Sequence, residues 1–186
     1  MSQVYSNSGR TGVDSGWAIK HGLIGGFIAG IIFAMGEMIE AWVVKGNPIL
    51  PMHMIAGIPL QQDPMKIDPT TAIIVGMIAH MLYSMVVGVI VAFIIAAVPA
   101  LRTSAVVTVV FTIVLGFLAW PLNFFIIAPL INAPWMPRDT NPVMQAIWHA
   151  VFGLVLGLYL ASRLPRTVRT GMPGTPGTQG SPRTVG

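Results

Sequence analysis

The sequence predicts an all-α membrane protein, a bundle of four transmembrane helices, and three observations lead to this prediction. The chain of 186 residues is 54% hydrophobic and only 9% charged, whereas soluble domains carry about 25% charged residues. Its mean hydropathy is +0.76. Four apolar stretches each reach the ~20 residues that a helix needs to cross a bilayer. They cover residues 22–44, 71–98, 104–131 and 143–162.

The rest of the chain divides into connections between these spans and two polar ends. A membrane domain is expected over 17–162, and the ends, 1–16 and 163–186, have no apolar periodicity and a composition typical of disorder. The first span is too long for a cleavable signal peptide. Two proline-rich connections cover 45–70 and 132–142, and part of the first is apolar enough to lie on the membrane surface.

The distribution of lysine and arginine predicts the orientation of the chain. Seven basic residues lie before the first span, after the last span or in the short connection around Arg102, against three in the proline-rich connections. We therefore expect a multi-pass protein of the inner (plasma) membrane with both termini in the cytoplasm. Arg163, Arg166 and Arg169 could also bind anionic lipid, although a topology signal accounts for them more simply.

Composition also excludes several classes of function. The pI is near 10.0, but the basic residues form no aromatic-rich face, so nucleic-acid binding is not expected. The chain has no cysteine, which excludes disulfides, thiolate metal ligands and cysteine nucleophiles. No nucleophile, base and orienting group occur together, so an enzyme of the soluble type is not expected.

Every span combines small residues at four-residue steps with one strongly polar residue. Small residues at this spacing let helices approach closely in lipid. The glycines concerned are Gly22, Gly26, Gly30, Gly76, Gly88, Gly116, Gly153 and Gly157. The polar residues are Glu37, His80, Asn123 and His149. At 1.5 Å per residue all four lie roughly 10–16 Å below the outer surface, so we expect them to form one buried cluster.

Three neighbouring residues extend the predicted cluster. Glu40 lies three residues after Glu37 and is shallower, so it could reach the lipid headgroups. Tyr83 and Ser84 follow His80 on the second span and could supply its hydrogen-bond partners. A charged or titratable side chain is costly inside a bilayer, which makes Glu37 the residue that is hardest to explain by packing alone.

Local signals predict where helices start and bend. Asp68-Pro69 and Asn141-Pro142 each combine an N-cap residue with a proline at the first helical position. Pro121 interrupts the third span and is expected to free the carbonyl of Phe117. His53 lies near a predicted interface, where we expect it to be solvated.

The sequence contains a short internal similarity. The segment "GMIAHMLYSMVVGVI" aligns with "QAIWHAVFGLVLGLY", with the two histidines, an aromatic residue, a small residue and a glycine in register. This alignment predicts a duplicated helical hairpin related by an axis along the membrane normal. Glu37 then corresponds to Asn123.

The segments "GGFIAGIIFAMGEMI", "PMHMIAGIPL", "HMLYSMVVGVI" and "HAVFGLVLG" resemble an uncharacterised family of small four-helix bacterial membrane proteins. The resemblance covers residues 18–162. Members are sometimes labelled sodium:proline symporters, but four spans are far fewer than such transporters use. The resemblance implies four spans and carries no established activity.

Three hypotheses for function remain open. The first is a membrane-embedded site for an ion, a proton or a small ligand, with Glu37 as the titrating or coordinating group and His80 and His149 as relay or ligands. The second is a non-catalytic packing module or accessory subunit of a membrane complex. The third is a b-type haem protein in which the two histidines are axial ligands. The sequence specifies neither metal nor cofactor, and it leaves a homo-oligomer or a larger complex open.

Overall fold

The computed structural model describes residues 14–164, and these residues are almost entirely helical, with no strand among them. The long helices are α1 (Ser15–Lys45), α3 (Pro69–Ala97), α4 (Ala105–Pro121) and α7 (Pro142–Arg163). A π-helical segment, η3 (Leu122–Ile127), and α5 (Ala128–Leu130) continue α4. The shorter elements are α2 (Leu50–Leu60), η1 (Pro64–Lys66), η2 (Pro99–Arg102) and α6 (Trp135–Asp139).

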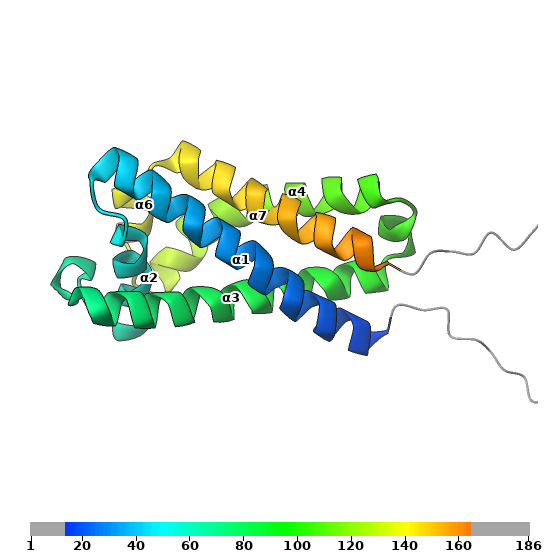
Figure 1. The fold of residues 1–186 in the computed structure, drawn as a ribbon, viewed down its shortest axis with the longest axis horizontal. Coiled ribbons are helices and arrows are strands. Elements are labelled where there is room, and N and C mark those ends of the chain that lie inside the picture. The colour runs from blue at the N-terminus through cyan, green and yellow to red at the C-terminus, as the bar shows by residue number, and fades with distance from the viewer. Residues whose placement is uncertain (1–13, 165–186) are drawn as a thin grey trace, which may run out of the picture.

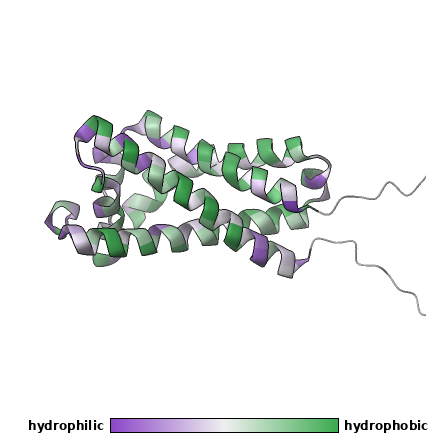
Figure 2. Ribbon diagram, in the orientation of Figure 1, coloured by the Kyte–Doolittle hydropathy of each residue, from purple (hydrophilic) through white to green (hydrophobic). Residues whose placement is uncertain are grey.

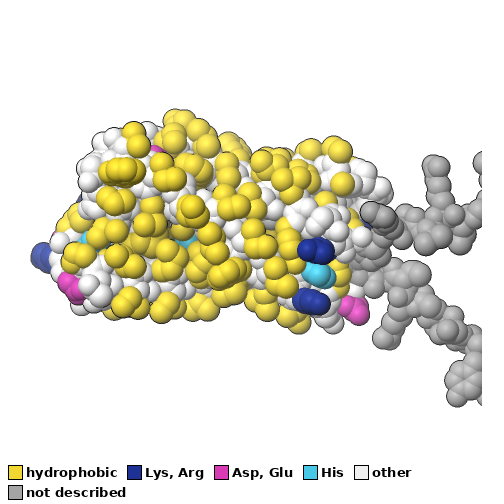
Figure 3. Space-filling model, in the orientation of Figure 1, with side chains coloured by type: hydrophobic (Ala, Val, Ile, Leu, Met, Phe, Trp, Pro, Cys, Tyr) yellow, Lys and Arg dark blue, Asp and Glu magenta, His cyan; other side chains and the backbone are white. Residues whose placement is uncertain are grey.

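Four of these helices, counting α4 with its continuation, are long and apolar enough to cross a membrane, as predicted. Apolar residues run along the length of the long helices in Figure 2. Hydrophobic side chains also cover most of the visible face in Figure 3, and most charged side chains gather toward its two ends. A surface of this kind is stable in hydrocarbon rather than in water.

The predicted boundaries need small corrections. Asp14 caps α1, because its carboxylate accepts a hydrogen bond from the Trp17 amide at 2.8 Å. Residues 15 and 16 are therefore helical, and the helix starts seven residues before the predicted span. At the other end α7 extends to Arg163, so this residue belongs to the helix rather than to the tail. Residues 1–13 and 165–186, with Arg166 and Arg169, lie outside the described residues.

The long helices associate as two tight pairs, α1 with α3 and α4 with α7. Glycines allow both approaches. A Cβ added to Gly22 would lie 2.5 Å from the Cα of Val89, and one added to Gly116 would lie 3.0 Å from the Cα of Gly153. The two helix backbones are in direct contact at these points, so any side chain in place of the glycine would push the helices apart.

In the two helix pairs, residues at corresponding positions make corresponding contacts. In the first pair Gly26 faces Ser84, and in the second Thr112 faces Gly153. One helical turn further along each pair, the contact involves a histidine: His80 Nε2 donates to the carbonyl of Gly30 at 3.0 Å, and Gly116 lies against the carbonyl of His149. The offsets between corresponding residues, 86 from α1 to α4 and 69 from α3 to α7, are those of the sequence alignment.

The ends of the bundle differ. Figure 1 shows α2 and α6 at one end, and η2 together with both described ends of the chain at the other. We call these the cap end and the terminal end. At the terminal end the Trp17 indole donates to the carbonyl of Arg163 at 3.0 Å, which ties α1 to α7. Buried apolar residues fill this half of the bundle: Ala18, Ala29, Val91, Ala92, Ile95, Leu156 and Leu160.

Helix α2, in the connection that was predicted to be partly apolar enough for the membrane surface, folds back against α3. Gly76 of α3 abuts the backbone of Met52, and Ala56 is fully buried. His53 is 5% exposed rather than solvated, because its Nδ1 donates to the carbonyl of Pro64 at 3.0 Å beneath η1. Part of the apolar surface of α2 thus packs against the long helices.

Neighbouring helices do not pack equally closely on all four sides of the bundle. Helix α1 packs against α7, whereas α3 and α4 make almost no close contact with each other. On the α3 side, two hydrogen bonds connect α2 and its C-cap, Gln61, to the segment between α4 and α7. The Trp135 indole donates to the carbonyl of Met54 at 3.0 Å, and the Gln61 amide donates to that of Ile131 at 3.3 Å.

Candidate functional site

A cavity of about 440 Å³ lies among the long helices in the cap half of the bundle. Ligand pockets usually measure 300–1,000 Å³. Helix α2 contributes part of the wall, and Lys45, Asp139 and Thr140 lie at the cap end. The four polar residues predicted to cluster all line this cavity: Glu37, His80, Asn123 and His149. Tyr83, Ser84 and Glu40 line it as well.

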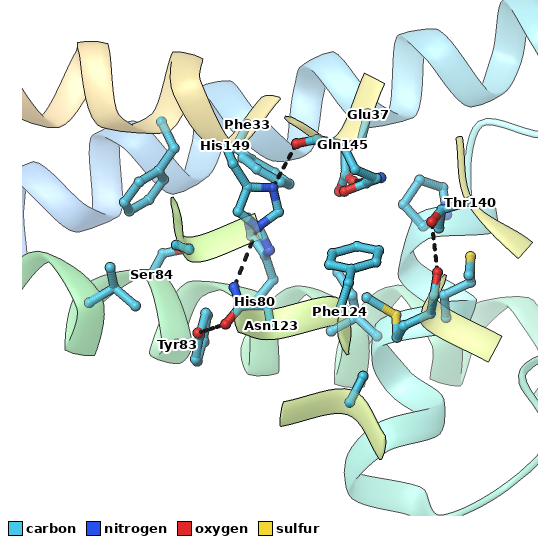
Figure 4. A pocket seen from close by; sticks show the side chains of 18 of the residues that line it. Phe33, Glu37, His80, Tyr83, Ser84, Asn123, Phe124, Thr140, Gln145 and His149 are labelled. Carbon is cyan, nitrogen blue, oxygen red and sulfur yellow. Dashed lines mark hydrogen bonds between the residues drawn. The ribbon is translucent and has the colours of Figure 1, made fainter. Parts of the chain in front are cut away.

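A chain of hydrogen bonds crosses the site from α3 to α1 (Figure 4). The Tyr83 hydroxyl donates to Oδ1 of Asn123 at 2.7 Å, and Nδ2 of Asn123 lies 3.4 Å from Nε2 of His149. His149 Nδ1 donates to the backbone carbonyl of Gln145 at 2.8 Å, and the side-chain Nε2 of Gln145 donates to Oε1 of Glu37 at 2.6 Å. These bonds therefore connect α1, α3, α7 and η3, the continuation of α4.

The hydrogen-bond partners determine which ring nitrogen of each neutral histidine carries the proton. A backbone carbonyl can only accept, so Nδ1 of His149 is the protonated nitrogen and Nε2 accepts from Asn123. His80 is the reverse case. Its Nε2 donates to the carbonyl of Gly30, so its Nδ1 holds a lone pair. Every donor in the chain from Tyr83 to Glu37 thus points in the same direction.

The two histidines converge without touching. Phe33 of α1 lies beside both, with its ring centroid 5.4 Å from that of His80 and 5.1 Å from that of His149. A haem held by both rings would have to displace this buried side chain, which is only 7% exposed. Within residues 14–164, no group of three His, Cys, Asp or Glu side chains is placed to hold a metal ion.

Glu37 lies in the least favourable environment for a carboxylate. It is 7% exposed, and its Oε1 has one donor, Gln145. Among residues 14–164 its Oε2 has no partner, and the ion pair that occurs there joins Arg138 and Asp139 on the surface. A buried carboxylate without a counter-charge costs free energy. A second hydrogen bond to Glu37 would therefore have to come from a molecule in the cavity.

The structure adds partners for Glu40 and Gln145 that the sequence did not predict. Glu40, which is shallow enough to reach the headgroups, accepts a hydrogen bond at its Oε2 from the Trp148 indole at 2.6 Å. Gln145 was not predicted, although it is 7% exposed and connects Glu37 to His149. Its position four residues before His149 puts it on the same helix face, and this spacing was the available signal.

Asn123 owes its position to an irregularity of α4. Pro121 was expected to interrupt the helix and free the carbonyl of Phe117; beyond it the chain runs on through the π-helical segment η3, in which the Ala128 amide donates to the carbonyl of Asn123. A proline removes one hydrogen bond of the α-helical ladder, and a π turn changes the register beyond it. Such π segments are frequent at functional sites.

Comparison of the chain with models of protein families, with curated proteins and with solved structures finds no match. The resemblance to the four-helix bacterial family therefore stays a prediction. Any function has to be inferred from the chemistry of the cavity itself.

Proposed function

We propose that this chain is a multi-pass protein of the plasma membrane whose cavity binds a small ligand or ion that enters from the outside. In this proposal the terminal end faces the cytoplasm and the cap end faces outward. The excess of lysine and arginine in the two ends of the sequence supports this orientation. Trp17 near one boundary and Trp42 and Trp135 near the other suit the two interfaces.

The observation that carries the proposal is that polar side chains line an open cavity. A module that only packs helices would fill its centre, because voids in a core cost stability. Here about 440 Å³ stays open beside Glu37 and His80. The second oxygen of Glu37 and Nδ1 of His80 have no hydrogen-bond partner among residues 14–164. A bound ligand would supply both.

The shared register of the two helix pairs favours a transporter over a simple receptor. Glu37 and Asn123 occupy corresponding positions, and so do His80 and His149. All four line one cavity between the pairs. In transporters built from repeated units, the substrate site also lies at the interface between the repeats. We therefore interpret the pairs as a duplicated hairpin around a substrate site.

Thiol accessibility tests the proposal directly, because the natural chain has no cysteine. Ala79→Cys and Ala119→Cys place single thiols in the cavity wall. Both should react in intact cells with a membrane-impermeant methanethiosulfonate added outside. The matched control is Ile78→Cys, because Ile78 is 56% exposed on the outside of the bundle and should be shielded by lipid. Failure of both cavity thiols to react would favour the packing-module hypothesis.

A further inference from the structure

We infer that the ligand of this cavity is a small organic ammonium ion held between the Glu37 carboxylate and the aromatic rings of the wall. This inference rests on the proposed function and narrows the class of ligand. Three independent features of the site lead to it: the missing counter-charge, the kind of atoms left free, and the composition of the wall.

The charges around the cavity favour a cation. Four charged side chains line it, and three of them are acidic: Glu37, Glu40 and Asp139, with Lys45 as the one base. Glu40 is engaged by Trp148, and Asp139 is paired with Arg138 at 2.7 Å. Glu37 alone is 93% buried without a counter-charge within residues 14–164, its exposure being 7%. A cationic ligand completes this ion pair.

The two most buried ionisable side chains of the cavity each leave an acceptor atom free. Oε2 of Glu37 and Nδ1 of His80 carry lone pairs, since Gly30 already takes the ring proton of His80. The Tyr83 hydroxyl and one N–H of Asn123 already donate within the hydrogen-bond chain, whereas the second N–H of Asn123 and the Ser84 hydroxyl can still donate to a ligand. A ligand with N–H groups and a positive charge matches these acceptors, while an anion would face two lone pairs.

The composition of the cavity wall favours an organic cation over a metal ion. Metal ions such as Ca²⁺ and Mg²⁺ require several oxygen ligands at fixed distances. The wall is instead mostly apolar, with the rings of Phe33, Phe124 and Phe152 and the side chains of α2 facing the space. Phe124 lies 5.8 Å from His149, close to the polar chain. Aromatic rings attract ammonium groups through the cation–π interaction, and apolar walls accept the carbon body.

Three probes of one shape and different charge test the ligand class: benzylammonium, benzyl alcohol and benzoate. Titrated calorimetrically into wild-type protein in detergent, benzylammonium should bind at least about tenfold more tightly than benzyl alcohol, which corresponds to about 1.4 kcal/mol. Benzoate should bind most weakly. Glu37→Gln should reduce the advantage of the ammonium to about twofold or less, as expected when one charge-assisted bond becomes neutral.

Asp68→Asn is the matched control, because it makes the same change from carboxylate to amide at the N-cap of α3, a residue that does not line the cavity. It should keep the preference for benzylammonium. Equal binding of the alcohol and the ammonium to wild type would overturn the ligand class but leave the cavity as a binding site. If no probe binds and none protects Ala79→Cys from modification, the proposed function fails as well.

An ethanolamine lipid headgroup carries the same ammonium chemistry as a free amine. The titration is therefore repeated in nanodiscs of phosphatidylglycerol with and without phosphatidylethanolamine. Unchanged affinity supports a free organic ammonium as the ligand. A several-fold loss of affinity on adding phosphatidylethanolamine supports the headgroup as the source, and that loss should be absent in Glu37→Gln.

Discussion

The Tyr83 hydroxyl donates to Oδ1 of Asn123 at 2.7 Å, and this bond joins α3 to η3 on the side of the bundle where α3 and α4 do not pack together. Tyr83 is 48% exposed and also lines the cavity, so its side chain lies in the wall between the cavity and the outside of the bundle. The bond therefore closes the cavity on the side that lacks direct helix packing.

Tyr83→Phe tests this closing role. The variant removes one hydrogen bond and keeps the ring, so we expect a loss of stability of about 1 kcal/mol or less. Access to the cavity should change more, and Ala119→Cys should be modified several-fold faster in the Tyr83→Phe background. Melting followed by tryptophan fluorescence and the rate of thiol modification measure the two effects.

Tyr159→Phe serves as the control, because it removes a hydroxyl that lies 3.2 Å from His21 at the terminal end, far from the cavity. It should leave the rate at Ala119→Cys unchanged. An equal acceleration by both variants would show that loosening of the whole bundle, and not the Tyr83–Asn123 bond, controls access.

The close approach of α1 and α3 depends on residues without a side chain. Gly88→Ala places a methyl group against the carbonyl of Gly22 and 2.7 Å from the Cα of Gly26. Neither backbone can move without separating the helices, so we expect a loss of at least ~1–3 kcal/mol, the usual cost of overpacking. Chemical unfolding in detergent measures it. Gly16→Ala, whose Cβ would meet nothing closer than 3.4 Å, should change stability little.

The sequence predicted these contacts because small residues at four-residue steps in an apolar helix are typical of close helix packing in lipid. It also located Glu37, His80, Asn123 and His149, since each is expensive in lipid and their depths agree. It could not predict the fold of α2, because an apolar, proline-rich segment suits a membrane surface as well as a helix groove. His53 was misplaced for the same reason.

The partners of the polar residues were harder to predict than the residues themselves. Gln145 bonds to Glu37 on another helix, and only the relative rotation of α1 and α7 decides this contact. The π-helical segment η3 likewise depends on how the chain accommodates Pro121. Periodicity assumes a regular helix, so it grouped Asn123 with the other three residues of the cavity but could not identify Tyr83 as its partner.

The N-caps of α3 and α7 allow a test based on pH. Asp68 accepts a hydrogen bond from the Thr71 amide at 3.0 Å, and hydrogen bonding from Thr71 lowers the pKa of the Asp68 carboxyl. Its charged form therefore stabilises the folded state above the ordinary pKa of aspartate, about 3.9. That stabilisation is lost as the pH falls through the lowered folded-state value.

Asp68→Asn should remove this contribution to acid sensitivity and keep the cap, because asparagine caps helices about as well. Asn141 caps α7 by accepting from the Val143 amide at 3.0 Å, so Asn141→Asp should add the same sensitivity at the other helix. Melting temperatures measured between about pH 2.5 and 6 give both curves. Parallel curves for wild type and Asp68→Asn would contradict the capping role of the carboxylate.

The orientation can be tested with four single cysteines. Gln62→Cys and Arg138→Cys lie in the cap-end connections, and Ser8→Cys and Thr175→Cys lie in the two ends of the sequence. An impermeant maleimide added to intact cells should label only the first two. Labelling of position 8 or 175 before the cells are permeabilised would reverse the proposed orientation.

The last prediction concerns the bond between Glu37 and Gln145. Glu37→Gln keeps an oxygen that can accept from Gln145 Nε2 at the present 2.6 Å contact, and it removes a charge from a site that is 7% exposed. A neutral amide carries less desolvation cost than a carboxylate, so stability without ligand should stay equal or rise. Glu37→Ala instead leaves the amide of Gln145 without its acceptor and enlarges the void, and it should cost about 2–4 kcal/mol.

Gln145→Leu is the complementary change, because it removes the donor and keeps the volume. In wild type it should be strongly destabilising, since it leaves the Glu37 carboxyl with no donor among residues 14–164. In the Glu37→Leu background the same change should cost little, because neither polar partner remains. Unfolding in detergent of the two single variants and the double variant gives the coupling energy directly. A coupling below about 0.5 kcal/mol would mean that the two side chains act independently, and that Glu37 is retained for its ligand rather than for its neighbour.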